Sequence, residues 1–181
     1  MMPKKKIATI WLGGCSGCHM SMLDMDERIL EIARLADIVK CPIVDGKELP
    51  EVDISLVEGA VTSDEHLREI LHIRKQSKLL VAFGDCAAMT NVTGMRNFFL
   101  LKDVIQTSYL NAPGNDGKGS LPSHPTLMKL HEKTYPLQEF VPVDFTIRGC
   151  PPDADTIFHV LFELLNDRVP DITAMHTLKY G

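Results

Sequence analysis

The chain has 181 residues, of which 45% are hydrophobic and 24% are charged, and its formal net charge is −5. This composition is typical of a globular protein with a real apolar core, so we expect residues 1–181 to form a single domain. The acidic balance argues against a nucleic-acid binder, which needs a basic face. No apolar run reaches the roughly 18–20 residues of a membrane span, and residues 1–12 lack the apolar stretch of a signal peptide. We therefore expect a cytoplasmic protein without a membrane span.

Apolar strands alternate with amphipathic helices along the chain. Residues 6–12 form the first predicted strand, and the apolar spacing of three, four and seven that follows predicts a helix over residues 18–36. Thr62 and Glu65 form a predicted capping box, with Thr62 as the N-cap, that opens a helix ending near residue 76. The remaining predicted elements are strands at 37–44, 52–61, 78–83 and 143–148, a short helix at 87–89, and helices at 96–106 and 153–167.

This alternation predicts the α/β class, a parallel sheet with helices on both faces. With five strands, a flavodoxin-like order of 2-1-3-4-5 is expected. Residues 107–142 are rich in proline and glycine and predict one long irregular loop before the last strand, with a short helix at 124–132. A loop of that length inside a compact domain is normally functional or forms an interface.

Four of the five cysteines follow the ends of predicted strands. Cys15 and Cys18 follow the first strand, Cys86 the fourth and Cys150 the fifth. Because the carboxyl ends of parallel strands meet at one rim of a sheet, where open α/β folds build their sites, these thiols predict a four-cysteine metal site. Cys41 lies inside the predicted second strand and is expected to be a buried structural residue.

Four thiolates suit either zinc or an iron–sulfur cluster. One Cys-x-x-Cys pair and two distant single cysteines favour a [4Fe–4S] cluster over zinc, which usually uses two compact pairs. Cys15-Ser16-Gly17-Cys18-His19 also matches the haem-attachment pattern, and the pair could be a thioredoxin-like dithiol, but both alternatives leave Cys86 and Cys150 unexplained. His19 is then expected at the helix start or at an interface rather than as a ligand.

Two charged residues lie at the same rim. Glu58 ends the third predicted strand and is either a proton-relay or interface carboxylate or an acceptor that bonds the glycine turns. Arg148, close to Cys150, either offsets the charge of the site or caps its strand.

Four motifs together resemble the small subunit of [NiFe] hydrogenases. They are Trp11-Leu12-x-x-Cys15-x-Gly17-Cys18, Glu58-Gly59, Gly84-x-Cys86-Ala87 and Gly149-Cys150-Pro151-Pro152. The resemblance implies that the four cysteines hold the proximal [4Fe–4S] cluster, facing a nickel–iron site in a separate large subunit.

The sequence departs from the periplasmic members of that family. It lacks their later cysteines and histidines, which implies a single cluster, and it has Gly14, His19 and Met20 where those proteins usually have acidic and hydroxyl residues. A single-cluster chain is similar to the small subunit of cytoplasmic NAD-reducing hydrogenases.

In those enzymes, diaphorase subunits with flavin and further iron–sulfur clusters reduce NAD, so the implied reaction is H2 + NAD+ → NADH + H+. Flavin in this chain is not expected, because cysteines occupy the first turn. Two alternatives stay open: a cluster subunit of a complex I-like quinone reductase, and a non-redox, zinc-bound assembly subunit.

Overall fold

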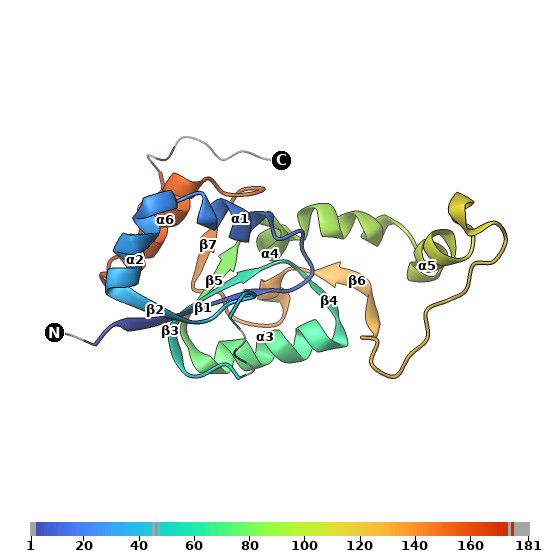
Figure 1. Ribbon diagram of the computed structural model, residues 1–181, viewed down its shortest axis with the longest axis horizontal. Helices are drawn as coiled ribbons and strands as arrows, with labels where there is room; N and C mark the ends of the chain where they lie inside the picture. The colour runs from blue at the N-terminus through green and yellow to red at the C-terminus, as the bar shows by residue number, and fades with distance from the viewer. Residues whose placement is uncertain (1–2, 45, 47, 174, 176–181) are drawn as a thin grey trace.

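A five-stranded parallel sheet forms the centre of the computed structural model, which describes residues 3–44, 46, 48–173 and 175 (Figure 1). The strand order is β2-β1-β3-β5-β7, and each neighbouring pair is parallel. Counted within this sheet, the order is the predicted 2-1-3-4-5, so the flavodoxin-like α/β prediction is confirmed. The strands are β1 (Lys5–Trp11), β2 (Ala36–Lys40), β3 (Val52–Glu58), β5 (Ser77–Phe83) and β7 (Phe145–Ile147).

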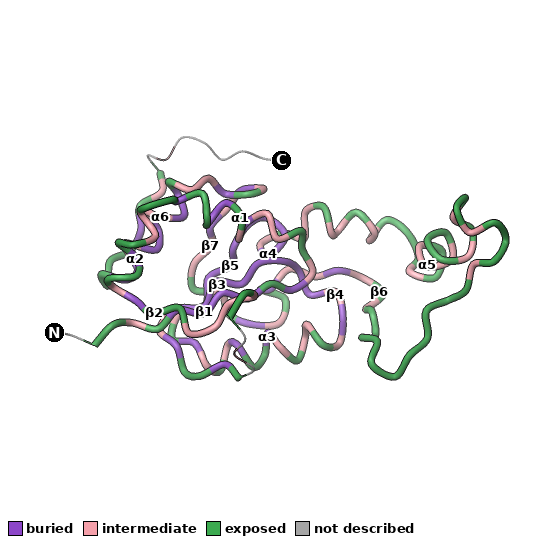
Figure 2. Tube along the Cα trace, in the orientation of Figure 1, coloured by how far each residue is buried: buried purple, intermediate pink, exposed green. Residues whose placement is uncertain are grey.

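Helices cover both faces of the sheet and bury two apolar cores. On β3, the adjacent residues Leu56 and Val57 are both fully buried and belong to opposite cores, which explains the unbroken apolar run of this strand. In Figure 2 the central strands β1, β3 and β5 are accordingly buried along most of their length, whereas the edge strand β2 is more exposed. The helices of one face are α1 (Gly17–Leu23), α2 (Ile29–Leu35) and α6 (Ala154–Leu165), and those of the other are α3 (Asp64–Gln76) and α4 (Asp85–Met89).

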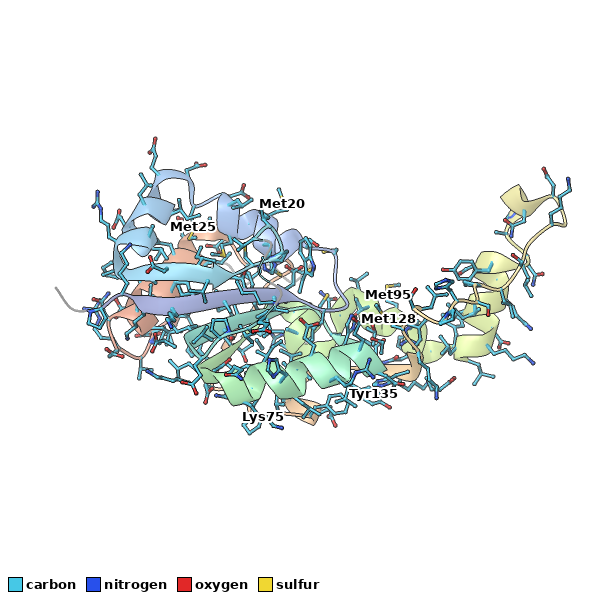
Figure 3. All side chains as sticks on the ribbon, turned by 60° about the horizontal axis from the view of Figure 1, so that its bottom comes forward. Met20, Met25, Lys75, Met95, Met128 and Tyr135 are labelled. Atoms are coloured by element: carbon cyan, nitrogen blue, oxygen red, sulfur yellow. The ribbon has the colours of Figure 1, made fainter. Side chains whose placement is uncertain are left out.

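The single helix predicted over residues 18–36 is divided in the structure. A short 3-10 segment, η1 (Asp26–Arg28), separates α1 from α2. Asp26 has φ +50°, a left-handed conformation that interrupts an α-helix. Met25 is 1% exposed and packs in the core, whereas Met20 is 59% exposed on α1; Figure 3 labels both. The apolar spacing was therefore a correct guide to burial but not to helix continuity.

The strand predicted over residues 52–61 is also divided. It ends at Glu58, and Gly59 turns the chain with φ +89°. A Cβ on Gly59 would lie 2.9 Å from the backbone of Gly13, so a larger residue does not fit at this turn. The chain continues as β4 (Val61–Ser63), which pairs antiparallel with β6 (Leu130–Tyr135) in a separate two-stranded sheet.

The start of α3 differs from the prediction by one residue. Ser63, not Thr62, is the N-cap, because its side chain accepts a hydrogen bond of 3.2 Å from the backbone N–H of His66. The Thr62 hydroxyl instead contacts His66 Nδ1 at 3.0 Å.

Residues 91–128 form an arm that projects from the carboxyl end of the sheet (Figure 1). Figure 2 shows that this arm is largely exposed. The helix predicted at 124–132 is wrong, because the end of that segment belongs to β6 and pairs with β4. Within the described residues no helix is both long and apolar enough to cross a membrane. The helical segments of the arm are η2 (Asn91–Phe98), α5 (Leu101–Tyr109) and η3 (Pro113–Asn115). A further 3-10 segment, η4 (Leu137–Glu139), follows β6.

At the opposite end of the sheet, Asp53 links β3 to its two neighbours. Its carboxylate accepts hydrogen bonds from the backbone N–H of Lys6 at 2.8 Å and from the Lys78 ammonium at 2.7 Å. Burial acts to raise the pKa of Asp53, but the bonds from Lys78 and Lys6 outweigh it and lower that pKa overall.

Candidate metal centre

Four cysteines lie at the carboxyl ends of three strands of the main sheet. Cys15 lies in the turn after β1 and Cys18 in the first turn of α1; Cys86 lies in α4, directly after β5, and Cys150 follows β7. Burial is the main cause that raises the pKa of Cys18, and the charges of Glu58 and of the other three thiols add to it. The structure thus places the four predicted cysteines and Glu58 within electrostatic reach of one another.

The thiols differ in their exposure. Cys18 and Cys86 are each 7% exposed, Cys150 is half-buried, Cys15 is exposed, and all are free thiols. Burial likewise raises the pKa of Cys86, with a smaller contribution from Cys150. The raised pKa values of Cys18 and Cys86 favour their protonated forms, and a bound metal would supply the positive charge that stabilises the two thiolates.

Glycines give the sulfur atoms the space that they occupy. Gly84 has φ +82°, and a Cβ at this position would lie 2.2 Å from Cys18 Sγ. A Cβ on Gly17 would lie 3.2 Å from Cys15 Sγ. The glycine turns predicted beside the cysteines therefore let the backbone approach the sulfur atoms closely.

The donor set consists of sulfur atoms, which is the set of structural zinc and of iron–sulfur clusters. Over the part of the chain that the structure describes, no three His, Cys, Asp or Glu side chains are spaced to hold a single metal ion. The donor set alone therefore fits both groups.

Glu58 is 1% exposed and bonds to the first turn of α1. Its Oε2 atom accepts a hydrogen bond of 3.1 Å from the backbone N–H of His19 and lies 2.5 Å from Nδ1 of the same residue. Glu58 is thus an acceptor that ties the residue after Cys18 to the end of β3, although its partner is His19 and not the glycine turns that the sequence suggested. The alternative role of Glu58 as a proton relay stays a prediction.

His19 lies at the predicted start of a helix, but its ring is turned inward. The side chain is 12% exposed and packs edge-on against Trp11 and Phe83, with ring centroids 5.5 Å and 5.8 Å away. Its Nε2 atom is buried without a hydrogen-bond partner among the described residues. The surface next to it is formed instead by Trp11, 45% exposed, and Met20.

Sequence reasoning missed Asp85, which is 3% exposed. Its Oδ1 atom accepts hydrogen bonds from Nε of Arg148 at 2.7 Å and from the backbone N–H of Gly149 at 3.1 Å. The sequence feature that could have indicated this residue is an acidic side chain directly before Cys86 in an otherwise apolar turn. Arg148, for which two roles were open, is therefore the ion-pair partner of this buried carboxylate.

Cys41 does not lie inside a strand as predicted. It follows the end of β2, is half-buried, and accepts a hydrogen bond of 3.3 Å from the backbone N–H of Val44. Cys41 thus follows the edge strand β2, whereas the four cysteines of the candidate centre follow β1, β5 and β7.

Comparison with known proteins gives a consistent result. Residues 15–164 match the family described as NADH ubiquinone oxidoreductase, 20 Kd subunit. The chain is 41% identical over 174 residues to the delta subunit of the NAD-reducing hydrogenase HoxS of Cupriavidus necator, covering 93% of this chain and 82% of that protein. It is 39% identical over 171 residues to a subunit of the F420-non-reducing hydrogenase vhu of Methanocaldococcus jannaschii, covering 92% of this chain but 58% of that protein.

A solved structure agrees with these relatives. A chain in the crystal structure of an NAD+-reducing [NiFe]-hydrogenase in the H2-reduced state superimposes with a TM-score of 0.94 at 34% identity, covering 99% of this chain and all of that one. The protein therefore belongs to the family of the 20 Kd subunit of NADH ubiquinone oxidoreductase and, within it, is a small subunit of the [NiFe] hydrogenase type.

Proposed function

We propose that this chain is the electron-transfer small subunit of an NAD-reducing [NiFe] hydrogenase and that it holds one [4Fe–4S] cluster. The observation that carries the proposal is the meeting of Cys15, Cys18, Cys86 and Cys150 at one rim of the sheet. The 41% identity to a subunit of an NAD-reducing hydrogenase supports the choice of reaction. The whole reaction is H2 + NAD+ → NADH + H+.

The chain's own residues would hold the cluster and limit its contact with water. When bound, a [4Fe–4S] cluster supplies one-electron redox chemistry between two-electron partners. Cys18 and Cys86 would bind it from the buried side, and Cys15 and Cys150 from the more exposed side. Glu58 and Asp85 fix the turns that carry these ligands through the hydrogen bonds described above. None of the four cysteines activates hydrogen, so that step belongs to the partner.

We propose that a large subunit with the nickel–iron site covers the rim and the arm. Soluble proteins rarely expose continuous apolar surface unless it binds a partner. The arm has a shallow groove of about 380 Å³, whose apolar lining is Met95, Phe99 and Val104. Figure 3 labels Met95 and Met128 where the arm joins the rest of the molecule. Phe98 beside this groove is 87% exposed. Diaphorase subunits with flavin and further clusters would accept the electrons.

The partner surface can be tested by one substitution with a matched control. Phe98→Ser should weaken binding of the large subunit by about ten-fold or more while leaving the thermal midpoint of the free chain unchanged, because the side chain is exposed. Val169→Ser removes an apolar side chain that is 89% exposed and lies next to the amino ends of β5 and β7, and it should have no effect on binding. Equal effects of the two variants would contradict this placement of the partner.

Purification of the chain with its partners tests the reaction. Under hydrogen, the complex should reduce NAD+, and the Cys86→Ser complex should not. The family match also leaves the complex I-like alternative open, and this alternative predicts reduction of a quinone instead. Quinone reduction without NAD+ reduction would contradict the proposal, as would zinc in place of iron in this chain once it is separated from its partners.

A further inference from the structure

Strands β5 and β7 bring Cys86 and Cys150 together through backbone pairing that continues beyond the strands. Their register aligns Phe83 with Ile147. After this pair, the N–H of Gly84 donates to the carbonyl of Ile147 at 2.8 Å, and the N–H of Asp85 donates to the carbonyl of Gly149 at 3.0 Å. Cys86 directly follows Asp85, and Cys150 directly follows Gly149. The sheet register therefore extends directly into the two turns that present these thiols.

The side chain of Asp85 adds a return bond to this ladder. Its Oδ1 atom accepts the N–H of Gly149 at 3.1 Å, so the two residues are joined in both directions. The same oxygen atom accepts Nε of Arg148 at 2.7 Å, and the guanidinium also contacts Met89 Sδ at 3.6 Å. A buried carboxylate is tolerated only where such bonds compensate its lost hydration, so the side chain is held in one place.

We propose that Asp85 is a positioning residue that fixes the separation between Cys86 and Cys150. The inference rests on the proposed function, because it takes both thiols as ligands of one cluster. Ligand distances in a metal site lie within about 0.2 Å of their standard values, so the turns that carry the ligands must be held in place. Groups that orient metal ligands generally contribute 10–100-fold to metal affinity. Asp85 acts in this way through the backbone, since it directly precedes Cys86 and bonds the residue before Cys150.

A second Asp–Arg ion pair lies at the other end of the same strands and provides a control for Asp85 and Arg148. Asp144, just before β7, accepts the N–H of Leu80 in β5 at 2.7 Å and forms an ion pair with Arg74. This carboxylate therefore also bonds one backbone amide across β5 and β7, together with one guanidinium, which here comes from α3. It lies at the amino end of β7, away from the cysteines, so its loss affects the β5–β7 pairing without touching the ligand turns.

The experiment compares Asp85→Ala, Asp85→Asn and Asp144→Ala in the full chain, purified anaerobically with its partners. The chain is then separated from its partners, which carry iron of their own; its iron and acid-labile sulfide are measured before and after competition with a chelator, and the reduced chain is examined by EPR. Asp85→Ala should lose iron to the chelator at least about ten-fold more readily than wild type. Asp85→Asn keeps an oxygen acceptor at the same place and should restore most of the retention. Asp144→Ala should retain iron like wild type.

A fourth variant keeps the inference testable if Asp85→Ala does not fold. Asp85→Glu keeps the charge but moves the acceptor atom by one methylene, so it should hold iron with an altered EPR spectrum. Wild-type retention and spectra in Asp85→Ala or Asp85→Glu would overturn the inference, as would an Asp85→Asn variant as defective as Asp85→Ala. A wild-type chain without iron would instead overturn the proposed function, so the two failures are distinguishable.

Discussion

Replacement of Gly84 by alanine should expel the cluster by displacing one ligand. The added Cβ would lie 2.2 Å from Cys18 Sγ, so the sulfur atom must move by about 1.2 Å to reach ordinary contact. That displacement exceeds the tolerance of metal–ligand distances several-fold. The backbone at φ +82° and ψ 170° adds about 1–3 kcal/mol of strain for any residue with a side chain. Overpacking adds about 1–3 kcal/mol more, so the chain should lose roughly 2–6 kcal/mol of stability.

The assay is iron content per chain together with the free energy of unfolding in denaturant. Gly114→Ala is the matched control, since a Cβ there has no atom within 4 Å and the residue has no positive φ. This control should keep its iron and be unchanged or slightly stabilised, by up to about 1 kcal/mol, through the unfolded state. If Gly84→Ala held as much iron as Gly114→Ala, the close approach of Gly84 to Cys18 would not matter, and the placement of this ligand would be refuted.

Three further predictions concern single side chains. Cys86→Ser should abolish iron binding whereas Cys41→Ser should preserve it, and equal iron contents would contradict the ligand assignment. Glu58→Ala should destabilise the chain by about 1–3 kcal/mol, because the backbone N–H of His19 loses its acceptor and the His19 ring loses its contact with the carboxylate, whereas Glu58→Gln should cost less. The native pKa of Asp53 is lowered, so its contribution to stability is present above its unfolded pKa of about 3.9 and is lost as the pH falls through the lower native value. Asp53→Asn should therefore flatten the acid limb of the stability profile below about pH 4, and an unchanged limb would contradict this.

The sequence predicted the sheet order and the cysteine rim because both depend on regular patterns. Apolar runs such as that of β3 indicate strands buried on both faces, and in a parallel sheet all carboxyl ends lie on one side. Cys18, Cys86 and Cys150 could be placed at this side from their positions after strands alone. Periodicity also identified Met25 as a core residue.

The strand and helix boundaries that were predicted wrongly depend on local backbone geometry and on tertiary pairing. An apolar run does not show that the chain leaves one sheet at Gly59 and enters another, because both strands are buried. Likewise, helical spacing continued through the left-handed residue Asp26. Tertiary pairing with β4, not local preference, made residues 130–132, the end of the predicted helix, part of strand β6.

The bonds that support the ligand turns could not be predicted from spacing. Asp85 and Gly149 lie 64 positions apart, and Glu58 and His19 lie 39 apart. Such contacts depend on which strands are neighbours and on their register. Once the β5–β7 register is known, the pairing of Asp85 with the residue before Cys150 follows directly.

The central claim, that four cysteines of this chain hold one [4Fe–4S] cluster, is tested most directly by metal and sulfide analysis. The chain, purified anaerobically with its partners and then separated from them, is assayed for iron, acid-labile sulfide and zinc, and EPR spectra are recorded after reduction. We expect about four iron atoms and about four sulfides per chain, with a paramagnetic signal in the reduced state. One zinc atom per chain without sulfide or a paramagnetic signal would contradict it.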